Sequence, residues 1–264
     1  MCKKILEKEP EAFVYLGSRD AGRGEKAVAD IKSELGAGAE ERIVCLPLDV
    51  TSDESVAAAA AAVEAPLYGI VNNAGVGFGL PIADTLAVNL YGSRRVSEAF
   101  IPLLDQAAGR VVNIASASGP MFVAGCGSDN KLATQLSDLD AMPSSFEELE
   151  AAVNEAYPPG CPDYDGASYG LSKACLTAYT VQLARRFPAL RVNAVTPGFI
   201  DTDITKGMGA RNPPEKGTIA PYFCLFEDVP FDPENGVNGR YYGSDSVRSP
   251  LDRYRGPGDP PYDP

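Results

Sequence analysis

Short apolar runs rich in strand-forming residues alternate with helix-forming segments along most of the chain, and this alternation constrains the fold more than any other feature. We predict strands at residues 12–16, 42–50, 68–72, 109–119, 190–198 and 238–246. We predict helices at residues 22–35, 52–65, 84–106 and 166–187, after the end of a further helix at residues 2–9. Because strands separated by crossover helices pair in parallel, the predicted fold class is α/β, a doubly wound parallel sheet with helices on both faces.

Residues 125–165 interrupt this alternation. The stretch is rich in Ser, Asp, Gly and Pro but contains one clear helix, "SSFEELEAAVNEAY", with Ser145 and Glu148 as a capping box. Phe146, Leu149 and Val153 share a face of that helix. We interpret residues 125–165 as an insertion within one domain, residues 1–248, that packs on the edge or mouth of the sheet.

The C-terminal residues differ in composition from the rest of the chain. Residues 249–264 end in "PLDRYRGPGDPPYDP", which is rich in proline and charge. Such segments bury few apolar side chains, so we expect a loosely held tail.

Composition excludes several classes of function. The 264 residues carry a net charge of −13, which argues against nucleic acid or an anionic membrane as the main partner. The chain has no histidine, so zinc sites with histidine ligands and Ser-His-Asp or Cys-His catalysis are excluded, and we expect no metal. The six cysteines form no C-x-x-C motif, and no apolar run approaches the ~20 residues of a membrane span. We therefore expect a cytoplasmic protein with reduced thiols.

Polar and small residues follow several predicted strands, where ligands bind in open α/β sheets. These residues are Asn72–Gly75, Ser116, the pair Tyr169 and Lys173, and Pro197 with Gly198. Tyr169 and Lys173 are four residues apart and share a face of a helix. A neighbouring ammonium group lowers the pKa of tyrosine from about 10, which suits a general acid or base. Taken alone, the pair is more typical of an exposed helix surface than of a catalytic site.

The order of these motifs carries more information than any one of them. Along the chain it runs Arg19, Asp49, "NNAG" at 72–75, Asn89, Ser116, "YGLSK" at 169–173 and "NAVTPGFIDTDI" at 193–204. In this order the motifs resemble the classical short-chain dehydrogenase/reductase family, from about residue 2 to residue 247. The 53-residue separation of Ser116 and Tyr169, with "YLGSRDAGRGEKAV" and "PEKGTIAPYFCL", most resembles the monomeric NADPH-dependent carbonyl reductases.

The resemblance implies a Rossmann-type fold and roles for four catalytic residues. Tyr169 would protonate the carbonyl oxygen of a ketone, aldehyde or quinone. Lys173 would lower the pKa of Tyr169 and hold the nicotinamide ribose. Ser116 would stabilise the developing negative charge on the substrate oxygen. Asn89 would hold a water relay to Lys173, or would be a structural asparagine that kinks its helix.

The resemblance also implies NADPH as the cofactor. Arg19 and Arg23 would bind its 2′-phosphate, which a guanidinium suits better than a carboxylate. Asp49 would accept from the adenine amino group, and Asn73 would lie against the adenosine ribose, with Asn72 structural. The remaining cofactor-binding residues implied by the resemblance are Gly75, Pro197, Gly198, Thr202, Tyr169 and Lys173.

One part of the family pattern does not occur in this sequence. The glycine-rich T-G-x-x-x-G-x-G loop and the first strand before it are not found in the chain, so we expect an N-terminal truncation. A truncated sheet would show a gap or a closer approach between the strands at 12–16 and 68–72. Three interpretations stay open: an incomplete sequence of a normal reductase, a shortened and catalytically impaired binding or structural subunit, or a reductase active without the loop. We expect a monomer, or an unknown protein partner if the truncation is real.

Overall fold

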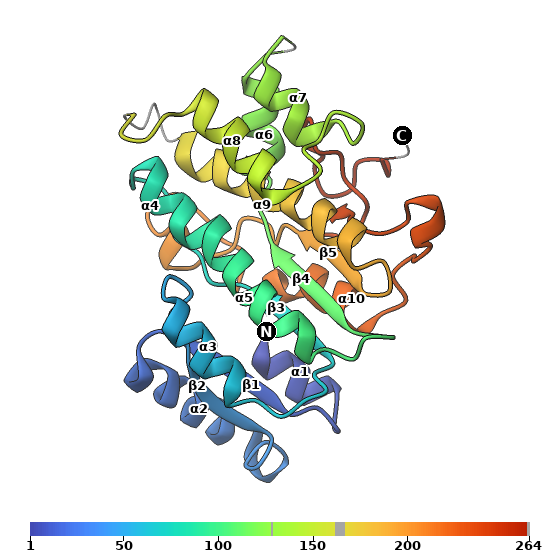
Figure 1. The fold of residues 1–264 in the computed structure, drawn as a ribbon. Coiled ribbons are helices and arrows are strands. Elements are labelled where there is room, and N and C mark those ends of the chain that lie inside the picture. Colours follow the sequence, from blue (N-terminus) through green and yellow to red (C-terminus); the bar gives the residue numbers. More distant parts are fainter. Residues whose placement is uncertain (128, 162–166, 263–264) are drawn as a thin grey trace.

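The computed structural model describes residues 1–127, 129–161 and 167–262 (Figure 1). All paired strands in it are parallel and lie in two sheets, one of order β1-β2 and one of order β3-β4-β5-β6. The strands are β1 (Val14–Ser18), β2 (Ile43–Pro47), β3 (Gly69–Asn72), β4 (Arg110–Ile114), β5 (Arg191–Val195) and β6 (Tyr241–Tyr242). Each predicted strand is therefore present, in several cases shorter than predicted.

Helices connect these strands. They are α1 (Cys2–Lys8), α2 (Ala21–Leu35), α3 (Asp53–Ala61), α4 (Ile82–Leu86), α5 (Ser93–Phe100), α6 (Ser118–Gly125), α7 (Lys131–Ser137), α8 (Phe146–Ala156), α9 (Ala167–Arg186) and α10 (Ile219–Phe226). Among the described residues, no helix combines the length and apolarity that crossing a membrane requires.

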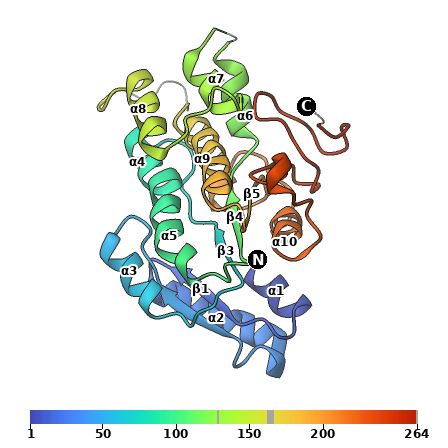
Figure 2. The same ribbon diagram turned by 45° about the vertical axis from the view of Figure 1, so that its right-hand side comes forward.

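Both faces of the larger sheet are buried, as a doubly wound fold requires. On β4, Val111 belongs to an apolar cluster that includes residues of α5, α8 and α9. The next residue, Val112, points to the other face and joins a cluster with residues of α1, α2 and α10. Figures 1 and 2 show these helices on opposite sides of the strands. The predicted Rossmann-type fold class is confirmed.

The hydrogen-bonded ladder is interrupted between β1 and β3. These two strands belong to different sheets, as the expected gap between residues 12–16 and 68–72 requires. Their apolar side chains nevertheless share one core, because Leu16 of β1 and Val71 of β3 pack in the same cluster as Ile5 of α1. Side-chain packing holds the two sheets together where backbone pairing does not.

Local signals explain which helices could be predicted. Asp20 caps α2 by accepting from the backbone N–H of Arg23 at 2.9 Å, and α2 ends at Gly36, whose φ is +66°. The helix predicted at 84–106 is interrupted by a π-helical turn over Ala87–Gly92.

Three helices were not predicted, namely α6, α7 and α10. α6 and α10 are mostly apolar and contain proline, and α7 has only seven residues, so none shows a clear amphipathic period.

The insertion at 125–165 packs mainly on helices rather than on the mouth of the sheet. Ser145 caps α8 as predicted, and the buried side chains of Phe146, Leu149 and Val153 face the core. The Phe146 ring lies 5.5 Å from that of Tyr179 on α9, and the guanidinium of Arg94 on α5 lies 3.9 Å above the same ring. α8 thus covers α5 and α9 together.

The C-terminal segment is more firmly held than its composition indicates. Ser249 donates its N–H to Tyr241 at 2.9 Å, and Tyr242 forms an antiparallel bridge with Arg248. Arg255 is buried and binds both carboxylate oxygens of Asp245, at 3.0 and 2.8 Å. The expectation of a loose tail is wrong here, because the segment pairs with the edge strand β6 and is anchored by this ion pair.

Candidate active site

Tyr169 and Lys173 lie in the first two turns of α9. The Nζ of Lys173 is buried and donates a hydrogen bond of 2.8 Å to the carbonyl oxygen of Ile114, at the end of β4. The same nitrogen lies 5.7 Å from the centroid of the Tyr169 ring. Burial lowers the pKa of Lys173 to about 8, because the charged ammonium has lost its water.

The pKa of Tyr169 departs from the sequence-based expectation. Burial raises it above the usual value of 10, and a hydrogen bond with Ser116 opposes this shift. Phe78 contributes to the burial, since its ring centroid lies 4.5 Å from that of Tyr169. The expected net lowering of the tyrosine pKa is therefore wrong for this structure, in which desolvation is the largest effect.

Ser116 reaches Tyr169 because two helices pack at close range. Ser116 follows β4 and leads into α6, and its Oγ accepts from the N–H of Ser118 at 3.2 Å. α6 and α9 approach each other through Gly119 and Gly170. A Cβ on Gly119 would lie 3.0 Å from the backbone nitrogen of Ala174, so a side chain there would push the helices apart. This close approach sets Ser116 beside Tyr169.

Asn89 is fully buried in the π-helical turn and joins three segments of the site. Its Oδ1 accepts from the N–H of Val76 at 2.8 Å, and its Nδ2 donates to the carbonyl of Val76 at 3.1 Å. The Nδ2 also donates to the hydroxyl of Ser172 at 2.9 Å, which donates to the carbonyl of Tyr169 at 2.8 Å. π-helical turns often occur at functional sites, and this one fixes Asn89 between the segment after β3 and the start of α9.

Gly75 lies where these groups converge. A Cβ on Gly75 would lie 3.2 Å from the Oδ1 of Asn89 and 3.5 Å from the Nζ of Lys173. Five sequence-predicted residues therefore meet at the carboxyl ends of β3 and β4: Gly75, Asn89, Ser116, Tyr169 and Lys173.

The residues predicted for the adenosine end lie at the carboxyl ends of β1 and β2. Asp49 accepts from the N–H and hydroxyl of Thr51, at 2.9 and 2.7 Å. These bonds, and more weakly the charge of Arg19, lower the pKa of the Asp49 carboxyl. Arg19 and Arg23 are both exposed to solvent, and so is Asn73 after β3.

The residues predicted after β5 form a separate turn. Gly198 has a φ of +91°, which favours glycine. Thr202 is exposed and bonds reciprocally with Thr205 around a short 3₁₀ turn. Ile204 in this turn lies close to Gly77, so the segment after β5 rests on the segment after β3. Within the part of the chain that the structure describes, no hydrogen bond joins Pro197, Gly198 or Thr202 to the five converging residues.

Sequence reasoning missed Phe78 and Ser172. Phe78 follows the NNAG motif by three residues, but nothing in its surroundings indicates a partner on α9. Ser172 stands inside YGLSK, where a small polar residue between Tyr169 and Lys173 was a usable signal. Asn72 was interpreted correctly as structural, since it is buried and donates to Asn113 at 2.8 Å.

Comparisons with known proteins identify the family of this chain. The sequence model of the short-chain dehydrogenase family matches residues 1–128. The chain is 30% identical to (+)-neomenthol dehydrogenase of Arabidopsis thaliana, over 79% of this chain and 81% of that protein. It is 28% identical to carbonyl reductase 3 (NADPH) of Mus musculus, over 85% and 84% of the two chains.

Solved structures give the same relationship. The structure of salutaridine reductase from Papaver somniferum superposes with a TM-score of 0.69 at 26% identity, covering 91% of this chain and 94% of that one. The motif order, the parallel fold and the sequence identities agree, and this chain belongs to the short-chain dehydrogenase family of oxidoreductases.

Proposed function

We propose that this protein is an NADPH-dependent carbonyl reductase that converts a ketone, aldehyde or quinone into the corresponding alcohol or hydroquinone. The observation that carries the proposal is the meeting of Ser116, Tyr169 and Lys173 at the carboxyl end of β4. The relatives named for carbonyl reduction with NADPH add support.

The proposed mechanism divides the work among these side chains. The hydroxyl of Tyr169 gives its proton to the carbonyl oxygen, and the hydroxyl of Ser116 donates a hydrogen bond to the same oxygen as negative charge develops there. Lys173, with a pKa of about 8, stays mostly protonated at neutral pH and stabilises the tyrosinate that is left. A bound NADPH, held by Lys173 at its nicotinamide ribose and by Arg19 and Arg23 at its 2′-phosphate, would supply the hydride to the carbonyl carbon. The substrate thus gains a hydride and a proton.

The residues present fit both ends of such a cofactor. Gly75 lets the backbone come close to Lys173 and Asn89, since a Cβ there would lie 3.5 Å from the Nζ and 3.2 Å from the Oδ1, and Lys173 would hold the nicotinamide ribose beside it. Arg19 and Arg23 are exposed at the start of α2, where guanidinium groups favour a 2′-phosphate, and Asp49 is held ionised nearby for the adenine amino group. Asn73 follows β3, whereas Pro197, Gly198 and Thr202 follow β5, which pairs with β4 on the side away from β3. All four remain proposed cofactor-binding residues.

The surroundings of Tyr169 suit an apolar substrate. Exposed apolar side chains lie on the two touching segments after β3 and β5: Phe78, Leu80, Phe199, Ile204 and Met208. Phe78 is 44% exposed although its ring lies against Tyr169. Burial of an apolar carbonyl compound here would cover surface that water now contacts.

We extend the proposal to the organisation of the protein. Residues 1–248 are one domain with the insertion at 125–165, followed by the C-terminal segment 249–264, and the protein acts as a cytoplasmic monomer. The cover that α8 forms over α5 and α9 supports the monomer, because it occupies helix surface that a second copy would otherwise need. Sedimentation that shows a stable dimer or tetramer would overturn this part.

The interruption between β1 and β3 favours a second candidate function. A sheet divided at this point is compatible with a catalytically impaired member that serves as a binding or structural subunit, alone or with a protein partner.

One pair of measurements separates the two functions. We expect the purified chain to bind NADPH by calorimetry and to oxidise it in the presence of a quinone or an aromatic ketone. If the protein melts cooperatively, and is therefore folded, but neither binds nor oxidises NADPH, the structural subunit is favoured.

A further inference from the structure

Arg255 of the C-terminal segment is buried, whereas most residues around it are exposed. Besides its two bonds to Asp245, its guanidinium donates to the carbonyl oxygens of Asp259 at 2.6 Å and Pro260 at 3.0 Å. The Asp245 carboxylate also accepts from the N–H of Gly258 at 3.1 Å. An ion pair with these partners holds a fixed position, because breaking it would leave a buried charge without water.

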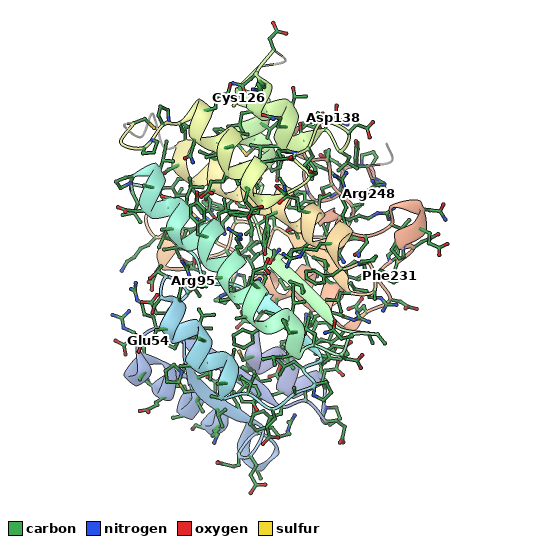
Figure 3. All side chains as sticks on the ribbon, in the orientation of Figure 1. Glu54, Arg95, Cys126, Asp138, Phe231 and Arg248 are labelled. Carbon is green, nitrogen blue, oxygen red and sulfur yellow. The ribbon has the colours of Figure 1, made fainter. Side chains whose placement is uncertain are left out.

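The ion pair fixes the loop at residues 243–246, which follows β6 and contains Asp245. A Cβ on Gly243 would lie 2.7 Å from the Oδ1 of Asp245 and 3.0 Å from the Nη1 of Arg255, so the loop is closely packed around the pair. Figure 3 labels Arg248, which follows this loop, on the side of the molecule where Figure 1 marks the C-terminus.

The same loop lies against the turn that follows β5. A Cβ on Gly198 would lie 3.1 Å from the Cβ of Ser244, the residue before Asp245. Gly198 has a φ of +91°, and its N–H donates to the hydroxyl of Thr196 at 3.3 Å. Thr196 donates its own N–H to the carbonyl oxygen of Tyr242 in β6, at 3.0 Å. The loop and β6 therefore support this turn together.

The supported turn leads to the proposed active site. It continues into residues 199–208, which carry several of the exposed apolar side chains near the site. The Cγ2 of Ile204 would lie 2.8 Å from a Cβ on Gly77. The residue after Gly77 is Phe78, whose ring centroid lies 4.5 Å from that of Tyr169. Contacts between neighbouring segments thus join the ion pair to the surroundings of Tyr169.

We propose that Arg255 is a positioning residue for the proposed active site. Through Asp245 it holds Ser244 against Gly198, and so sets the position of the turn proposed to bind the cofactor and of the apolar segment beyond it. The groups proposed to transfer the proton are held by β4, α6 and α9 instead, so Arg255 acts on binding rather than on proton transfer. The inference rests on the proposed reductase function.

Steady-state kinetics of the full chain tests the inference, with NADPH and an aromatic ketone as probes. In Arg255→Gln we expect the KM for NADPH to rise roughly fivefold or more while kcat stays close to that of the wild type, because the turn loses its support and the proton donor does not move. Arg255→Lys keeps the charge but not both hydrogen bonds to Asp245, so its KM should lie between the two. Asp252→Asn breaks the exposed pair with Arg253 in the same segment and should keep the wild-type KM.

A second variant tests the contact with Gly198 without breaking the ion pair. Ser244→Gly removes the Cβ that faces Gly198 and should also raise the KM for NADPH. Ser246→Gly is the matched control, because it makes the same change in the same loop at a φ of +62°, which already suits glycine. Ser246→Gly should keep the wild-type KM.

Hydrogen exchange tests the inference separately from the proposed function. In the chain without ligand, Arg255→Gln and Ser244→Gly should speed amide exchange in residues 196–208, while exchange in residues 110–114 of β4 stays as in the wild type. If Arg255→Gln folds poorly, Ser244→Gly decides both measurements.

The outcomes separate the two proposals. If the wild-type chain neither binds nor oxidises NADPH, the proposed function fails, and exchange in residues 196–208 decides the inference alone. Wild-type exchange in these residues, or a wild-type KM for NADPH in both active variants, would overturn the role of Arg255.

Discussion

The Nζ of Lys173 lies 2.8 Å from the carbonyl oxygen of Ile114, so the end of β4 holds the ammonium group of α9 in a fixed position. The hydrogen bond replaces part of the water that Lys173 has lost, but burial still lowers its pKa to about 8. The same contact ties the first turns of α9 to the strand that leads to Ser116.

This relationship predicts how stability varies with pH. Between pH 8 and the ordinary lysine pKa of 10.5, the unfolded chain binds the Lys173 proton and the native state does not, so this residue makes stability rise with pH across that window. Below pH 8 the native state binds the proton as well, and the full cost of burying the charged ammonium group lowers its stability. Denaturant unfolding at pH 7 and pH 10 should show a rise in the free energy of unfolding of the wild type, relative to Lys173→Met, of about 2.5 kcal/mol. Both proteins contain the same titrating cysteines and tyrosines, so the difference between their free energies of unfolding reports Lys173 alone. Parallel pH profiles of the wild type and Lys173→Met would contradict the prediction.

A second prediction concerns cofactor choice. Arg19→Asp should weaken NADPH binding at least tenfold and leave NADH binding the same or stronger, because a carboxylate repels the 2′-phosphate and can accept from a 2′-hydroxyl. Lys26→Asp makes the same change of charge on the exposed side of α2, where Lys26 pairs with Asp30. Calorimetric titration of both cofactors should distinguish the variants, and equal effects of the two substitutions would remove Arg19 from the site.

A third prediction concerns the link between Asn89 and Tyr169. Ser172→Ala removes the acceptor of one Asn89 amide hydrogen in a fully buried position, which should destabilise the protein by about 1–3 kcal/mol. Ser137→Ala, which removes a half-buried hydroxyl bonded to a helix carbonyl on α7, should cost less. Urea unfolding of both variants measures the difference, and a neutral Ser172→Ala would mean that Asn89 finds another acceptor.

A fourth prediction concerns the C-terminal segment. Arg255→Gln breaks both bonds to Asp245 and should release the segment from β6, so that trypsin cuts faster after Arg248 and Arg253. Asp252→Asn breaks only the exposed pair with Arg253 and should leave the rate of cleavage after Arg248 unchanged. Equal cleavage of Arg255→Gln and wild type would show that the strand bridge alone holds the segment.

Periodicity and motif order predicted much of the fold, because the strands and most helices are specified by local signals such as the Asp20 cap and the stop at Gly36. They could not predict α10 or the anchored C-terminal segment, since both depend on distant partners: the apolar core for α10 and Asp245 for Arg255.

The same limit applies to the candidate site. The sequence placed Tyr169 and Lys173 on one face, but the sign of the Tyr169 pKa shift depends on burial, to which Phe78 contributes from a different segment. A spacing rule reports which residues can meet, whereas burial and hence pKa depend on what the whole fold packs around them.

The rate of NADPH oxidation by Tyr169→Phe tests the proposed function most directly. The substitution removes the proton donor and keeps the ring that packs on Phe78, so the fold and NADPH affinity should stay close to those of the wild type. Tyr157→Phe, which removes a half-buried hydroxyl after α8, is the matched control. With a quinone or an aromatic ketone, we expect Tyr169→Phe to lose at least 100-fold in kcat, as removal of a general acid does, while Tyr157→Phe keeps the wild-type rate. Retention of most of the activity by Tyr169→Phe would contradict the assignment of Tyr169 as the proton donor.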